Sequence, residues 1–69
     1  MSETNLGVQF PIEQARVRKI LGHYHQIGPA GLPGAFLIEQ VLKRADEAAV
    51  EQDVVAMIRS YKEMQEIKE

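Results

Sequence analysis

The seven residues 28–34, with the sequence GPAGLPG, carry the strongest chemical signal in this chain. Three glycines and two prolines exclude a regular helix here and indicate a rigid connection between helices. The next helix would begin at Pro33 or Gly34, so its free backbone N–H groups and positive dipole end would lie in this segment. Such a helix start binds phosphate or carboxylate readily. The segment therefore predicts a small anion-binding site at Gly31, Gly34 and Ala35.

A purely structural turn is the alternative interpretation of the same segment, and the sequence favours it. The phosphate-binding pattern Gly-x-x-x-x-Gly-Lys-Ser/Thr is missing, no strand precedes the glycines, and the segment contains no basic residue. Pro29 and Pro33 also remove two of the backbone N–H donors that an anion would need. The sequence alone leaves both interpretations open.

The other polar residues predict neither a metal centre nor catalysis. His23 and His25 lie two positions apart, so on a helix they point to opposite sides and cannot chelate one metal ion. Arg16, Arg18 and Lys19 spread around their helix, without the aromatic residues that stack on bases in nucleic-acid sites. A domain of this size rarely encloses a catalytic pocket. We therefore expect no catalytic residue, metal, cofactor or nucleic-acid partner, and no enzyme activity.

The composition indicates one small globular domain with few means of stabilising itself. The 69 residues include no cysteine, so neither a disulfide nor a thiolate–metal site can add stability. Chains of this length keep only about 3–5 kcal/mol of folding stability when they fold alone. Self-association is the remaining common remedy, and we expect a homodimer.

The charge and hydropathy patterns limit the cellular environment. The net charge is −2, but residues 11–27 carry +2 while residues 39–69 carry −3. No apolar run approaches the roughly 20 residues of a membrane span, so no membrane partner is expected. The first five residues have neither the basic nor the apolar part of a secretory signal. We therefore expect a cytoplasmic protein.

Apolar residues at spacings of three and four predict three helices and hence an all-α fold. The first helix would run from Pro11, which suits a first helical turn, to Ile27. The second would begin near Pro33 or Gly34, and the third after Asp53, whose carboxylate can cap it. The expected core residues are Val17, Ile20, Leu21, Tyr24 and Ile27 in the first helix, Leu37, Ile38, Val41, Leu42, Ala45, Ala48 and Ala49 in the second, and Val54, Met57, Ile58, Tyr61 and Met64 in the third.

The phase of these apolar residues predicts a reversal of the chain at residues 51–53. On one continuous helical wheel, the apolar residues of 37–49 and those of 54–64 would face opposite sides. A break lets both groups contribute to one core, with the second and third helices forming an antiparallel hairpin. The domain would span residues 11–69, preceded by a flexible arm, residues 1–10.

Phe36 lies off the main apolar side of its helix, among charged residues. Either the connection and the first helix cover it, or it is an exposed anchor for another chain. An anchor would make Tyr24, Leu32 and Phe36 the expected contact residues of an interaction surface.

Three segments in order, Gly28–Gly31, Ala45–Ala48 and Asp53–Tyr61, resemble short helical proteins encoded in bacteriophage and prophage genomes. The resemblance covers residues 17–65 and rests on the spacing of the turns. That group has no established activity, so the resemblance implies only a bacterial cytoplasm and an accessory role, and it assigns no functional residue.

Two functions remain as hypotheses. The first is a non-enzymatic protein–protein interaction module that forms a homodimer and acts on a host or phage protein. The alternative is a binder of small anionic ligands or nucleotides at the helix start after residues 28–34.

Overall fold

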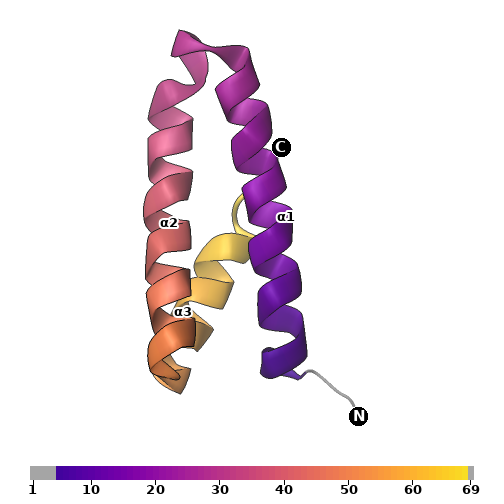
Figure 1. Cartoon of the computed structure of the whole chain (residues 1–69), viewed down its shortest axis with the longest axis vertical. Helices are drawn as coiled ribbons and strands as arrows, with labels where there is room; N and C mark the ends of the chain where they lie inside the picture. Colours follow the sequence, from indigo (N-terminus) through magenta and orange to yellow (C-terminus); the bar gives the residue numbers. More distant parts are fainter. Residues whose placement is uncertain (1–4, 69) are drawn as a thin grey trace.

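The described part of the chain folds as three α-helices joined by two short connections (Figure 1). This computed structural model describes residues 5–68. In it α1 spans Leu6–Ile27, α2 spans Leu32–Glu51 and α3 spans Val54–Gln65, with one 3-10 turn, η1, over Pro29–Gly31. No strand occurs in residues 5–68, so the predicted all-α class is confirmed. Helices α1 and α2 lie side by side, and α3 packs against both of them (Figure 1).

Helix α1 begins at Leu6, five residues before the predicted start at Pro11. The prediction of an arm is therefore wrong for residues 6–10, while residues 1–4 lie outside the described part of the chain. A proline inside a helix removes one backbone hydrogen bond and costs about 3 kcal/mol. The side chain of Phe10 is only 1% exposed in the core, and its burial contributes about 1.5–3 kcal/mol. This burial offsets much of the cost of Pro11.

The connection between α1 and α2 depends on close packing against Tyr24. Gly28 ends α1 with a positive φ of 88°, a conformation that favours glycine, and its N–H donates to the His25 carbonyl at 3.1 Å. A Cβ on Gly34 would overlap the Tyr24 ring, lying 2.7 Å from its Cδ2. A Cβ on Gly31 would overlap the Tyr24 carbonyl oxygen and lie 3.2 Å from the carbonyl carbon. These two glycines therefore let the start of α2 approach α1 closely.

The predicted break between the second and third helices is confirmed. Helix α2 ends at Glu51, and Gln52 adopts a left-handed conformation with φ 55° and ψ 34°. Asp53 then caps α3, because its Oδ1 accepts a hydrogen bond from the Ala56 N–H at 3.1 Å. The carboxylate cap was also predicted.

The core lies where the three helices meet, and it is smaller than the predicted one. Its buried hydrophobic members are Phe10, Val17, Ile20, Ala35, Ile38, Leu42, Ala45, Ala48 and Met64. Four residues that were predicted to be core are exposed: Ile27, Leu37, Val54 and Ile58. The molecule is only 15 Å across its shortest axis, so its helices lack a second layer that could cover these side chains.

Polar contacts from α1 hold the other two helices in place. The guanidinium of Arg16 donates to the carbonyls of Met64, at 2.7 Å, and Ile67, at 2.9 Å, at the end of α3. Its other N–H groups reach Glu13 at 2.7 and 3.0 Å, and this hydrogen-bonded pair raises the pKa of Arg16. Asp46 of α2 accepts hydrogen bonds from Gln14, at 2.8 Å, and from Arg18. Arg16 and Arg18 of α1 thus have structural partners on the other two helices.

Candidate functional site

The predicted anion-binding residues lie in the packed contact between α1 and α2. Gly31 and Ala35 are buried, and Gly34 faces the Tyr24 ring. Their positions give both glycines a packing role that requires no ligand. The anion site stays a prediction, and the structural turn accounts for the same residues.

Two of the three predicted contact residues lie exposed on one side of α2. Leu32 is 55% exposed and Phe36 is 59% exposed, and their spacing of four places them on the same side of the helix. Ile27 is also exposed, and it lies beside the start of α2, because a Cβ on Gly31 would be 3.2 Å from the Ile27 Cβ. We call Ile27, Leu32 and Phe36 the tip patch. Tyr24, the third predicted residue, is half-buried against the core instead.

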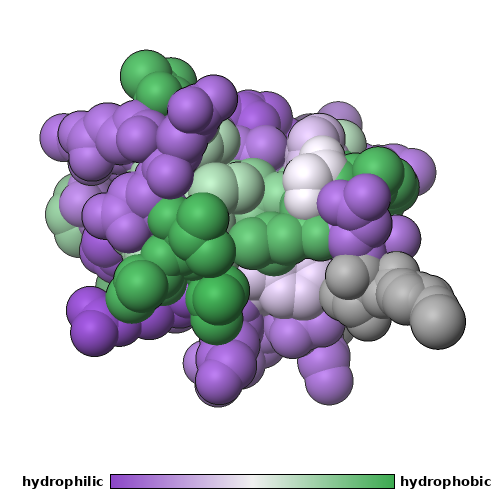
Figure 2. Space-filling model, turned by 90° about the horizontal axis from the view of Figure 1, so that it is seen from below, coloured by the Kyte–Doolittle hydropathy of each residue, from purple (hydrophilic) through white to green (hydrophobic). Residues whose placement is uncertain are grey.

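A second apolar surface lies at the opposite end of the molecule, around the turn between α2 and α3. Val50, Val54 and Ile58, here called the turn patch, are all exposed, Val50 the most at 84%. Figure 2 looks onto this end and shows apolar side chains gathered on one side of it. The helical pattern had placed Val54 and Ile58 in the core, so the sequence did not identify this surface.

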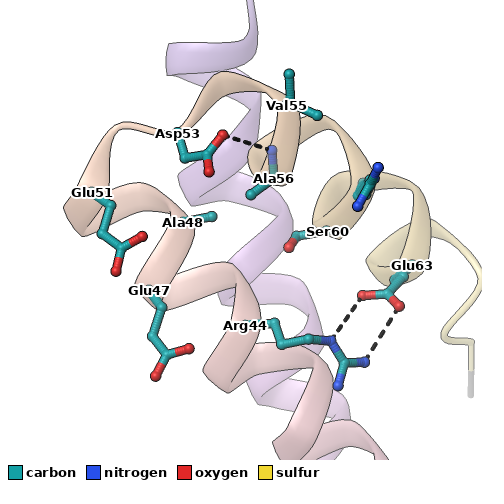
Figure 3. A pocket seen from close by; sticks show the side chains of 10 residues that line it. Arg44, Glu47, Ala48, Glu51, Asp53, Val55, Ala56, Ser60 and Glu63 are labelled. Carbon is teal, nitrogen blue, oxygen red and sulfur yellow. Dashed lines mark hydrogen bonds and ion pairs between the residues drawn. The ribbon is translucent and has the colours of Figure 1, made fainter.

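A groove of about 480 Å³ lies between the second half of α2 and α3 (Figure 3). Its inner surface is formed by small side chains, Ala48 and Ser60 among them, which leave space between the two helices. The full set of lining residues is Arg44, Glu47, Ala48, Glu51, Asp53, Val55, Ala56, Arg59, Ser60 and Glu63.

The charges around the groove are mostly negative, with four carboxylates and two guanidinium groups. Arg44 bridges α2 to α3 through Glu63, with N–O distances of 3.3 and 3.4 Å (Figure 3). Glu47 and Glu51 are spaced one turn apart on α2 and form no ion pair within residues 5–68. The sequence signal for this groove was the run of alanines at the end of α2, which allows a neighbouring backbone to approach.

The histidines and carboxylates form no metal site in the described part of the chain. No group of three or more His, Cys, Asp or Glu side chains with metal-binding geometry occurs there. His25 instead pairs with Glu39 of α2, with 3.3 Å between Nε2 and Oε2. None of the described helices combines the length and the apolar composition that crossing a bilayer requires.

Comparisons of the chain with protein-family models, with curated proteins and with solved structures give no match. The resemblance to phage-encoded proteins stays a prediction. The two apolar patches and the groove are the surface features of the described residues that could bind a partner.

Proposed function

We propose that this protein is a non-enzymatic protein–protein interaction module that forms a homodimer through the tip patch. The observation that supports this proposal is the exposure of Leu32 and Phe36 on the same side of a regular helix. Exposed, contiguous apolar side chains on a small domain are typical of interaction surfaces. An aromatic anchor on a rigid helix also loses little conformational freedom when it is buried.

The size of the molecule is compatible with a homodimer. A standard interface buries about 800 Å² on each partner, which is about a sixth of the 4734 Å² surface of this chain. Two-fold symmetry would bring both copies of the tip patch into one interface, doubling the number of buried side chains. The dimer would thus supply apolar burial that the thin monomer lacks.

The wider assembly follows from the same proposal. The antiparallel hairpin of α2 and α3 would hold the tip patch and the turn patch at opposite ends of one rigid helix pair. The tip patch would then join two copies, while the rest of the surface contacts a host or phage protein in a bacterial cytoplasm. The resemblance noted in the sequence supports this setting.

Sedimentation equilibrium over a wide concentration range tests the dimer. We expect the wild-type mass to rise above the monomer value of 7.8 kDa, and Phe36→Ser to shift the equilibrium to monomer. Leu37→Ser is the matched control, because Leu37 is 66% exposed on another side of the same helix. A wild-type protein that stays monomeric throughout would contradict the proposal, as would an equal loss of dimer in Leu37→Ser.

A further inference from the structure

The groove between α2 and α3 is separate from the tip patch and shares no residue with it. We propose that this groove receives a lysine side chain presented by a segment of a partner protein. The inference goes beyond the homodimer, since neither surface requires the other to be occupied.

The size and the apolar lining of the groove accommodate an aliphatic side chain. Its volume of about 480 Å³ lies within the range of about 300–1,000 Å³ that ligand pockets occupy. Ala48, Ala56 and Val55 provide apolar contact surface from both helices. A lysine places its methylene groups on such a surface and keeps its ammonium group at the polar rim.

The charge of the rim selects a cation. Asp53 already accepts the Ala56 N–H, and Glu63 is paired with Arg44 (Figure 3). The carboxylates of Glu47 and Glu51 have no such partner within the described residues, so they remain able to accept hydrogen bonds from an ammonium group. Arg59 lies on α3, and its positive charge repels an ammonium group. The ligand's ammonium group is therefore favoured on the α2 side of the groove.

Ser60 adds a hydroxyl group to the inner surface of the groove, independently of the carboxylates. This residue is only 3% exposed, and its side chain points into the groove (Figure 3). Its hydroxyl forms no hydrogen bond within residues 5–68. Every side-chain polar atom that is shielded from solvent in these residues has a hydrogen-bond partner, so the Ser60 oxygen is not shielded. The hydroxyl must therefore open onto the groove, where it can accept a hydrogen bond from the ligand.

An NMR titration of the full chain with a capped peptide, acetyl-Ala-Ala-Lys-Ala-Ala-amide, tests this inference. We expect amide shifts confined to residues 44–63 and a dissociation constant in the millimolar range. The binding should weaken with added salt, because the charged groups lie at an open rim. A peptide with norleucine in place of lysine keeps the methylene groups without the charge, and it should not bind.

Variants of the groove separate its charge from its hydroxyl group. Glu47→Gln with Glu51→Gln should weaken binding about tenfold. Ser60→Ala, which keeps the helix intact, should also weaken binding, but only about fivefold, because the hydroxyl then accepts no hydrogen bond from the peptide. The control, Glu39→Gln with Glu66→Gln, changes the net charge equally outside the groove and should leave binding unchanged.

Several results would overturn the inference. Equal binding of the norleucine peptide would show that the charge is not recognised. An equal loss in the Glu39 and Glu66 control would show that only net charge matters. Tighter binding of free 1,5-diaminopentane than of the peptide would identify a diamine site instead. Phe36→Ser should keep peptide binding intact, so a failed dimer proposal and a failed groove proposal give different results.

Discussion

Alanine substitutions at three glycines test whether the start of α2 depends on close packing or on a ligand. Gly22, Gly31 and Gly34 differ in what a new Cβ would meet. Around Gly22 no atom lies within 4 Å of that position. At Gly34 the new Cβ meets the ring of Tyr24, and at Gly31 it meets the backbone carbonyl of Tyr24.

The free energies of unfolding should therefore fall in a definite order. Gly22→Ala should stabilise the protein by about 1 kcal/mol, because alanine favours the helix and finds open space. Gly34→Ala should destabilise it by only about 1–2 kcal/mol, because the Tyr24 ring that the new methyl group meets can rotate away. Gly31→Ala should cost about 3 kcal/mol, because the α1 backbone itself must move.

Urea denaturation followed by far-ultraviolet circular dichroism measures these differences. A loss of about 3 kcal/mol approaches the entire stability of about 3–5 kcal/mol that is expected for a domain of this size. Gly31→Ala should therefore be largely unfolded, whereas Gly22→Ala should have a higher midpoint than the wild type. A Gly31→Ala protein as stable as the wild type would refute the packing explanation and favour a role for Gly31 in ligand binding.

Substitutions at Arg16, Asp53 and Gln52, with their controls, test the ends of α2 and α3 by the same denaturation assay. Arg16→Ala should destabilise the protein by about 2 kcal/mol, because two carbonyls at the end of α3 lose a charged, partly exposed hydrogen-bond donor. The control Arg18→Ala breaks an exposed ion pair and should destabilise the protein by less than about 1 kcal/mol. Folding raises the pKa of Arg16, so the stability that Arg16 contributes is complete below its pKa in the unfolded chain and is lost only as the pH rises through its pKa in the folded protein. The loss of stability in Arg16→Ala should therefore be constant across neutral pH. A strong pH dependence in that range would contradict this reasoning. Asp53→Ala should cost about 1 kcal/mol through loss of the α3 cap, with Asp53→Asn as the conservative control. Gln52→Gly should stabilise the turn by about 1 kcal/mol because its φ is positive, and a destabilised variant would count against a left-handed residue at this position.

Local features of the fold were predictable from the sequence, whereas features that depend on distant contacts were not. The break at Gln52 and the cap at Asp53 arise from nearby residues and from the change in helical phase, and both were predicted. The early start of α1 depends on Phe10 meeting the other helices, so the proline signal at Pro11 was misleading. A local pattern could not foresee that burial.

The candidate surfaces show the same division. The exposure of Phe36 was one of two predicted outcomes, because its neighbours on the helix are charged. The exposure of Val54 and Ile58 was missed, since periodicity identifies an apolar side but does not show whether another layer covers it. The groove forms because Ala48 and Ser60 face each other from the two helices that the turn joins. Predicting it would require knowing how α2 and α3 pack.

The shortness of α3 has a consequence for how the protein opens. Its 12 residues are at the lower limit for a helix that persists alone in water, so its helical state depends on docking against α1 and α2. The segment should therefore undock and unwind as one cooperative unit, and its amides should exchange with solvent before those in the middle of α1 and α2. Undocking also abolishes the groove, so any molecule held there would slow hydrogen exchange along the whole of α3, including amides that it does not touch.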